Sequence, residues 1–428
     1  MKQNKNKRIL LCALSFLALL TFSSPFIVSY YYLPSQIKLT VGQEHKVNFD
    51  IPMKAQIVSK ELLKVKNAKS LLDDEAKVKL NEPLYLEMDT IGKTSINLSI
   101  FGGIPLKTVS VEAMPYKEVI PCGDIIGVKV SSDGICVLGT GEFEVDSKMV
   151  NPSGNNLQKG DIIIEANGLK PKSKEDFREI IQANQDNPMQ IEVIRDSKNK
   201  NLEIVPIYSQ KEEEYKIGAW IKDSTQGIGT LTYFDPETLS FGALGHGITD
   251  VDLKKVMPIR EGEITTASIT AIKKGEKGEP GEISGVIQYN EKNIIGKVEK
   301  NTSLGIYGTI NDRGLETICH NKMPIAFQNE VHEGGATILA NVTGDGVGEY
   351  KVYIQKVAAY SAEPSKGMVV KIIDEELLSL TSGIVQGMSG SPIIQDGKLI
   401  GAITHVFVQD PTKGYGIFIE NMINNEEK

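Results

Sequence analysis

The second half of the chain consists of short runs of β-branched residues separated by glycines. From residue 212 to 428 these runs recur at short intervals, and few stretches have the apolar spacing of a helix. Short strands joined by glycine-containing turns are typical of β-barrels and β-sandwiches. We therefore expect a β-barrel domain over residues 212–428. A chain of 428 residues is long enough for two or three domains in all.

The N-terminus has the pattern of a targeting segment. Four of the first eight residues are basic, and no charged residue follows between Ile9 and Ser35. This uncharged stretch reaches membrane-spanning length and ends near three tyrosines. We interpret residues 1–35 as a cytoplasmic tail and membrane anchor, with a cleaved signal peptide as the alternative. Because the basic flank stays in the cytoplasm, the rest of the chain is expected outside it.

Two smaller domains are expected between the anchor and the barrel. Residues 36–115 alternate between apolar and polar side chains, as at Ile96, Leu98 and Ile100, which predicts a β-rich spacer. Residues 119–210 contain strand-like runs, the sequence LQKGDIIIEANG at 157–168, and a helix capped by Ser173. The segment 119–210 resembles a PDZ domain of the type found in bacterial proteases.

The PDZ resemblance implies a peptide-binding function. Such domains bind an extended peptide by adding it to the edge of a strand beside a helix. Their carboxylate-binding loop has a glycine between hydrophobic residues, and the sequence IIGV at 125–128 is the candidate for it. The alternative interpretation is a spacer domain that binds nothing.

The segment GMSGSP at 387–392 has the residues that a serine nucleophile needs. Glycines at 387 and 390 permit positive φ, so the N–H groups of Gly387 and Ser389 can converge on one oxygen. Acyl transfer also requires a base to take the proton of the serine. In isolation the segment would be interpreted as a glycine-rich turn.

Histidine is the natural base, and the chain has five of them. His246 has a glycine on each side, which leaves its imidazole accessible after an apolar stretch. His405 interrupts a strand-like run and is expected to have a structural or pocket-lining role. His45 lies in the spacer, and His320 and His332 are expected to be structural.

An α/β-hydrolase is a poor alternative, because that motif has glycine where Ser391 stands and its histidine follows the serine.

The order of anchor, spacer, PDZ domain, His246 and the 387–392 segment resembles the stage IV sporulation protein B family of serine peptidases, in the chymotrypsin-like clan. The strongest matches are residues 243–246, 383–394 and 401–407. The resemblance implies a mainly β fold with a chymotrypsin-like barrel, and a triad of His246, Asp374 and Ser389. The role of Asp374 as the acid rests on the resemblance alone, and Asp250 and Asp235 are its competitors.

The resemblance also implies a function in sporulation signalling. The enzyme would be a membrane-tethered serine endopeptidase in the space between forespore and mother cell. It would cleave a membrane-bound regulator of an intramembrane protease, and would also cleave itself near the anchor. The alternative is a membrane-anchored PDZ adaptor whose peptidase-like domain is inactive.

Composition argues against several other classes of function. Charged residues make up 24% of the chain and the net charge is −8, so nothing favours nucleic acid as a partner. Outside the anchor, the cysteines Cys122, Cys136 and Cys319 have no close spacing. They indicate neither a zinc site nor a disulfide framework, and we expect no metal and no cofactor.

Overall fold

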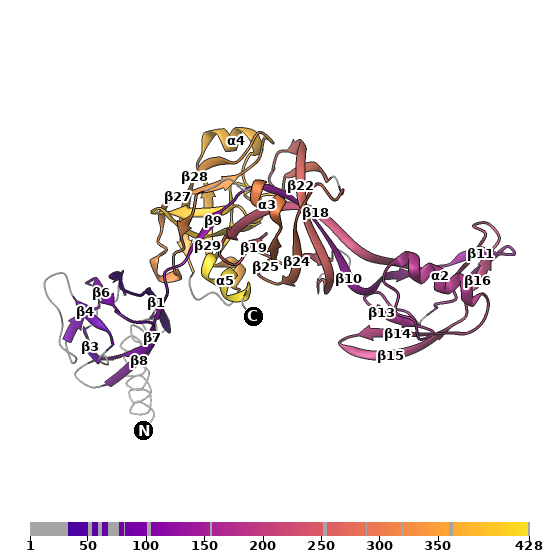
Figure 1. Cartoon of the computed structure of the whole chain (residues 1–428), viewed down its shortest axis with the longest axis horizontal. Coiled ribbons are helices and arrows are strands. Elements are labelled where there is room, and N and C mark those ends of the chain that lie inside the picture. Colours follow the sequence, from indigo (N-terminus) through magenta and orange to yellow (C-terminus); the bar gives the residue numbers. More distant parts are fainter. Residues whose placement is uncertain are drawn as a thin grey trace, which may run out of the picture. The chain divides into compact units, whose positions relative to one another are not determined.

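The computed structural model describes residues 33–49, 54–58, 62–66, 77–80, 82–100, 104–154, 156–250, 255–287, 289–317, 321–358 and 363–426 (Figure 1). The predicted anchor lies almost wholly outside these residues, as do Cys319 and His320. Among the residues described, no helix combines the length and apolar character needed to cross a bilayer. The chain divides into two compact units, Met1–Lys117 with Ala326–His332, and Glu118–Ile325 with Glu333–Lys428.

The first unit is built from two small sheets. One has the strand order β1 (Gln36–Thr40), β8 (Ile104–Met114), β7 (Gly92–Ile100), β3 (Lys54–Val58) and β5 (Lys77–Lys79). The other has the order β2 (His45–Val47), β6 (Leu84–Glu87) and β4 (Lys64–Lys66). Alternate side chains such as Ile96 and Leu98 are buried, as the sequence pattern predicts. His45 is also buried and accepts a hydrogen bond from the N–H of Thr40 (2.8 Å).

The second unit contains two closed six-stranded barrels. In the first, the ring is formed by β10 (Ile125–Thr140), β22 (Ile259–Lys273), β24 (Ile294–Thr302), β25 (Gly305–Ile310), β19 (Ser240–Ala243) and β18 (Ala219–Asp235), and pairing of β18 with β10 closes it. The second consists of β27 (Gly334–Ala340), β28 (Gly348–Val357), β29 (Met368–Ile372), β32 (Lys413–Phe418), β31 (Lys398–Val406) and β30 (Pro392–Gln395). The prediction of a mainly β chain with a barrel is confirmed.

Shorter elements complete the barrels. The remaining strands there are β9 (Glu118–Pro121), β20 (Thr249–Asp250), β21 (Lys255–Val256), β23 (Glu282–Ile287) and β26 (Met323–Pro324). The helices are α3 (Asp312–Thr317), α4 (Glu375–Thr381) and α5 (Ile419–Glu426), with a 3₁₀ turn at Pro364–Lys366. A second 3₁₀ turn, Gln328–Glu330, belongs to the first unit. Ile419, Met422 and Ile423 bury one side of α5 against Ile417 and Leu399 of the second barrel.

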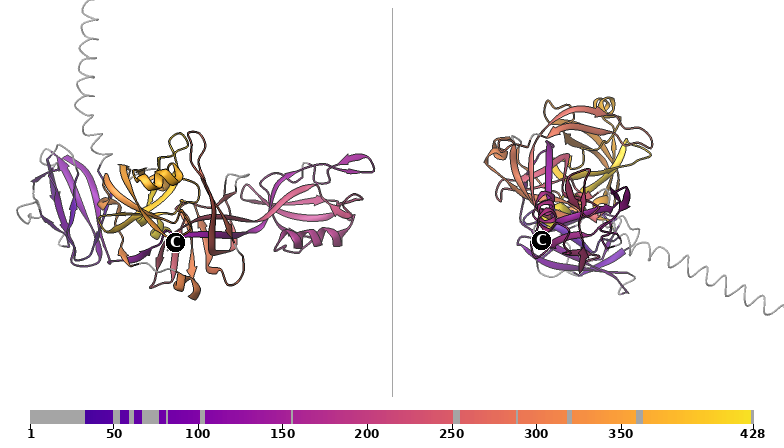
Figure 2. Two further views of the ribbon diagram at one scale, coloured as in Figure 1. Left: turned by 90° about the horizontal axis from the view of Figure 1, so that it is seen from above. Right: turned by 90° about the vertical axis from the view of Figure 1, so that its right-hand side faces the viewer.

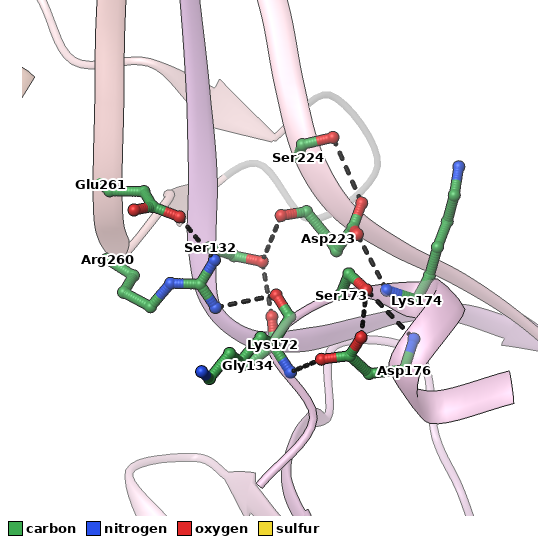
Figure 3. Close-up of polar contacts among 10 residues, drawn as sticks. All are labelled: Ser132, Gly134, Lys172, Ser173, Lys174, Asp176, Asp223, Ser224, Arg260 and Glu261. Atoms are coloured by element: carbon green, nitrogen blue, oxygen red, sulfur yellow. Dashed lines mark hydrogen bonds and ion pairs between the residues drawn. The ribbon is translucent and has the colours of Figure 1, made fainter. Parts of the chain in front are cut away.

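The predicted PDZ domain is built on the sheet of β13 (Ile162–Ala166), β14 (Met189–Arg195) and β15 (Lys198–Ile204). Helix α2 (Lys174–Asn184) covers one face of that sheet with Phe177 and Ile181 (Figure 2). The side chain of Ser173 accepts from the N–H of Asp176, as the capping pattern predicts (Figure 3). Two hairpins flank the domain, β11 (Phe143–Val145) with β12 (Lys148–Val150), and β16 (Ile207–Ser209) with β17 (Glu214–Lys216).

Strands β10 and β18 run through both the first barrel and the PDZ domain (Figure 1). Residues 126–131 of β10 pair with β22 in the barrel, whereas residues 136–140 pair with residues 219–222 of β18 in the PDZ domain. The candidate carboxylate-binding loop at 125–128 therefore lies inside a barrel strand with partners on both sides. That interpretation of the IIGV sequence is wrong, because a strand paired on both edges has no backbone donors to offer a ligand.

Candidate functional site

His246 lies directly after β19 of the first barrel, in a tight turn. Leu244 and Gly245 both have positive φ (70° and 68°), which turns the chain sharply before the imidazole. The half-buried ring places Nδ1 3.0 Å from the carbonyl oxygen of Gly247. Because a carbonyl oxygen only accepts, Nδ1 carries the proton in this contact and Nε2 keeps a free lone pair. This is the tautomer that a general base requires.

Ser389 lies in the loop that enters β30 of the second barrel. Gly387 and Gly390 have φ values of 102° and 99°, a conformation that glycine adopts without strain. The N–H groups of Met388, Gly390 and Ser391 are used in backbone hydrogen bonds within and behind the loop. Those of Gly387 and Ser389 donate to no other described residue. These two N–H groups are the donors that the sequence predicts for an oxyanion.

His246 and Ser389 line the same cavity of about 480 Å³. Residues from both barrels form its wall. The apolar part consists of Val128, Ile228, Leu244, Ile248, Ile384, Val385 and Val406. The polar part includes Gln226, Gln386, Thr404 and His405. The fold thus brings together two predicted site residues that are far apart in the sequence.

The nucleophile and the base are not hydrogen-bonded to each other. Ser389 Oγ donates to the carbonyl oxygen of Thr404 (2.7 Å). Thr230 of β18 makes two hydrogen bonds to the backbone of the Ser389 loop. Its N–H donates to the carbonyl oxygen of Ser389 (3.0 Å), and its Oγ1 donates to the carbonyl oxygen of Gly387 (2.7 Å). Thr230 and Thr404 could not be recognised from the sequence, because each is one more polar residue in a strand and carries no local signal.

His405 also lies in the cavity, in agreement with a pocket-lining role. Its ring centroid is 5.0 Å from that of His246. Partial burial lowers the pKa of His405 to about 4, and the charges of His246 and Lys366 act in the same direction. Burial also lowers the pKa of His246, although the hydrogen bond to Gly247 opposes this change. Both rings are therefore neutral at pH 7.

The lowered pKa of His246 predicts activity that persists in mild acid. A general base works only when neutral, and burial disfavours the imidazolium, so more acid is needed to protonate it. The rate at which a fluorophosphonate modifies the protein should fall as the pH is lowered. The midpoint of this acid limb should lie below the ordinary histidine pKa of about 6.5. The His405→Asn variant should keep this limb, because His405 is already neutral above a pH of about 4. A limb at or above the ordinary value would contradict the prediction.

Asp374 lies outside the cavity and caps helix α4. Its Oδ1 accepts from the N–H of Leu377 (3.1 Å) and its Oδ2 from that of Lys351 (3.2 Å). Partial burial raises the pKa of Asp374, but these N–H groups outweigh it and hold the pKa below the ordinary value. The structure does not bring Asp374 to His246, so its role as the acid stays a prediction.

The two competing aspartates are placed differently. Asp235 is buried at the end of β18, and its Oδ1 accepts from the N–H of Glu237 (2.9 Å). Asp250 is in β20, beside Thr249, which lines the cavity. Among the described residues no carboxylate is hydrogen-bonded to His246.

The same part of the chain has no group of three or more His, Cys, Asp or Glu side chains that could hold a metal ion.

Residues 213–423 match the family model of the SpoIVB peptidase S55. Among solved structures, the PDZ domain of an SdrC-like protein from Listeria monocytogenes is 25% identical and covers 22% of this chain and 90% of its own (TM-score 0.18). The corresponding domain from Listeria innocua is 24% identical over 19% of this chain and 92% of its own (TM-score 0.16).

A third solved structure is the HtrA-type protease AlgW with a decapeptide. It is 11% identical to this chain and covers 48% of this chain and 53% of its own (TM-score 0.27). No curated protein sequence matches the chain.

The fold and the family match define the class of the molecule. Two closed barrels with a cavity lined by residues of both, together with the match to a peptidase family model, define a serine peptidase. The domain formed by residues 213–423 belongs to the SpoIVB peptidase S55 family.

Proposed function

We propose that the chain is a serine endopeptidase in which His246 deprotonates Ser389. The observation that supports this is the shared cavity, in which the base of one barrel and the nucleophile of the other face a common space. Nε2 of His246 would accept the proton of Ser389 Oγ as Oγ attacks the substrate carbonyl, and would later return it to the leaving amine. The N–H groups of Gly387 and Ser389 would stabilise the oxyanion. The side chains of Ser389 and His246 must first turn toward each other, because Ser389 Oγ donates its hydrogen bond to the carbonyl oxygen of Thr404.

For the triad acid we propose Asp374, which the resemblance implies. Asn caps a helix as well as Asp does but cannot stabilise an imidazolium. The Asp374→Asn variant keeps the helix cap to Leu377 but loses the acceptor for the N–H of Lys351. Its melting temperature should therefore fall slightly, and its kcat/KM should fall at least about 100-fold. An Asp250→Asn variant is the matched control and should stay active. A fully active Asp374→Asn variant would rule Asp374 out, and the role would pass to whichever of Asp250 and Asp235 loses activity as Asn.

The remaining features of the proposal concern the cellular setting. We place the enzyme on a membrane through residues 1–35, outside the cytoplasm and between forespore and mother cell. Its substrate would be a membrane-bound regulator of an intramembrane protease, with a peptide ligand on the PDZ domain and self-cleavage near the anchor. The family name supports the sporulation role, and the uncharged N-terminal stretch supports the anchor.

A serine-directed fluorophosphonate tests the proposed chemistry. The full-length protein in detergent is expected to form one covalent adduct, which mass spectrometry of the digested protein should place on Ser389. An intact, folded protein that forms no adduct would instead support the adaptor function, in which the barrels bind protein without cutting it.

A further inference from the structure

Two imidazole rings lie close together in the catalytic cavity. His246 follows β19 of the first barrel, and His405 is in β31 of the second. Both residues line the cavity of about 480 Å³, and their ring centroids are 5.0 Å apart with an interplanar angle of 36°. The proposed mechanism uses His246 as the base and gives His405 no part. The closeness of a second imidazole is therefore a feature that the peptidase chemistry does not explain.

The separation of the two rings fits a single tetrahedral metal ion. With zinc–nitrogen bonds of about 2.0–2.1 Å and tetrahedral angles, two imidazoles on one zinc ion have ring centroids roughly 5 Å apart. The observed distance between the centroids of His246 and His405, 5.0 Å, agrees with this value. The two barrels thus hold the rings at the separation that a shared ion needs. Neither residue is buried, so an ion reaches the pair from solvent.

The ring nitrogens of both residues are available to a metal. Nδ1 of His246 donates to the carbonyl oxygen of Gly247 (3.0 Å), which leaves the lone pair of Nε2 free. A histidine that binds a metal usually donates its second ring N–H to a carbonyl or carboxylate group in this way. Among the described residues, none is hydrogen-bonded to the ring nitrogens of His405. His246 therefore already has the supporting contact of a metal ligand, and His405 has a nitrogen to offer.

The surroundings of the pair tolerate a divalent cation. Lys366 and Glu363 act on His405 with opposite signs, and they form an ion pair with each other (2.5 Å). Their charges therefore largely cancel beside the ring. Two protein ligands leave two positions of a tetrahedral ion for water. Such a site binds more weakly than a structural site with four protein ligands, which suits an ion that comes and goes.

We propose that His246 and His405 together bind one Zn²⁺ ion, and that the bound ion reversibly inhibits the peptidase. The inhibition rests on the proposed function, because it requires His246 to be the general base. The ion occupies the lone pair of Nε2 that would accept the proton of Ser389 Oγ, so the serine is not activated while zinc is bound. Imidazole suits zinc, whereas magnesium prefers oxygen ligands, so magnesium should not have this effect.

The test combines two measurements on the full-length protein in detergent, with zinc chloride as the probe. Isothermal titration calorimetry measures binding of the ion, and the rate of fluorophosphonate labelling measures the reactivity of Ser389. We expect saturating zinc to lower the labelling rate at least about ten-fold, because it removes the general base. A chelator should restore the rate, and magnesium at the same concentration should leave it unchanged.

His405→Asn tests the second ligand without altering the base. Each variant is compared with its own labelling rate in the absence of zinc. The zinc concentration that halves this rate should rise at least about ten-fold in His405→Asn, since even the loss of a residue that only supports a ligand costs that much affinity. His332→Asn is the matched control, because His332 is exposed and does not line the cavity. It should be inhibited like the unmodified protein.

His246→Asn separates the metal site from the peptidase function. Calorimetry should show that His246→Asn and His405→Asn both lose the ion that the unmodified protein binds, whether or not the protein reacts with fluorophosphonate. Loss of this ion in both variants, with no labelling of the unmodified protein, would support the metal site and overturn the proposed peptidase function.

Two other results would overturn the inference and leave the peptidase function standing. The first is a labelling rate of the unmodified protein that does not depend on zinc. The second is equal sensitivity of His405→Asn and the unmodified protein to zinc, which would exclude His405 as a ligand.

Discussion

The Ser389→Ala variant is expected to lose about 10⁴- to 10⁶-fold in kcat/KM and all labelling by fluorophosphonate. The substitution removes only the hydroxyl group, and within the described part of the chain Oγ makes a single hydrogen bond, to the carbonyl oxygen of Thr404. The loss should therefore come from the chemistry and leave the melting temperature almost unchanged. Thermal unfolding and active-site labelling, measured on the same preparation, check both parts of this expectation.

Ser391 provides the matched control within the same segment. Its side chain is fully buried, and its Oγ has no hydrogen-bond partner among the described residues. Replacing such a hydroxyl with a methyl group removes an unsatisfied polar group and should be neutral or slightly stabilising. Ser391→Ala should label normally. Equal loss of labelling in both variants would contradict the assignment of Ser389, and labelling that survives Ser389→Ala would overturn it.

The second large effect is expected from Gly390→Ala. At Gly390 a Cβ would lie 2.2 Å from the carbonyl oxygen of Thr230 and 2.6 Å from the nitrogen of Leu244, and the φ of 99° is one that alanine rarely adopts. These neighbours are backbone atoms of the first barrel and cannot move aside as a side chain does. The backbone strain alone costs about 1–3 kcal/mol, and the clash adds to it. The variant should therefore lose labelling and have a lower melting temperature.

Gly335→Ala is the corresponding control. Gly335 lies in a strand of the second barrel, and a Cβ there would have no atom within 4 Å. Its melting temperature and labelling should match those of the unmodified protein. If Gly390→Ala were as stable and as reactive as Gly335→Ala, the close approach of the Ser389 loop to Thr230 and Leu244 would be refuted.

Local patterns predicted much of the fold. The alternation at Ile96 and Leu98, the Ser173 cap and the glycine-separated strand runs all report on neighbours within a few residues, and the structure has these elements in place. The length of β10 could not be predicted in the same way. Its first half belongs to a barrel and its second half to the PDZ domain, and both halves have the same strand pattern.

The site was predicted only in part, for a similar reason. Ser389 and His246 each stand in a glycine-rich segment that signals an exposed turn, and the fold brings them to one cavity. The acid has no such signal, since an aspartate that caps a helix and one that orients an imidazole look alike in a sequence. Thr230 contacts the Ser389 loop and Thr404 accepts from Ser389 Oγ, but the sequence does not indicate either role. Their partners lie more than ten residues away along the chain.

By itself the sequence determined that the chain is mainly β and that Ser389 and His246 are its reactive candidates, and it predicted a PDZ domain before the barrels. Those conclusions depend on side-chain alternation, capping and glycine conformation, which are local properties. Only the tertiary structure decided that the IIGV segment at 125–128 is paired along both edges inside a barrel, and that Ser389 and His246 share one cavity. The physical reason is that backbone N–H groups are available to a ligand only where no neighbouring strand uses them, and strand pairing is a long-range property of the fold.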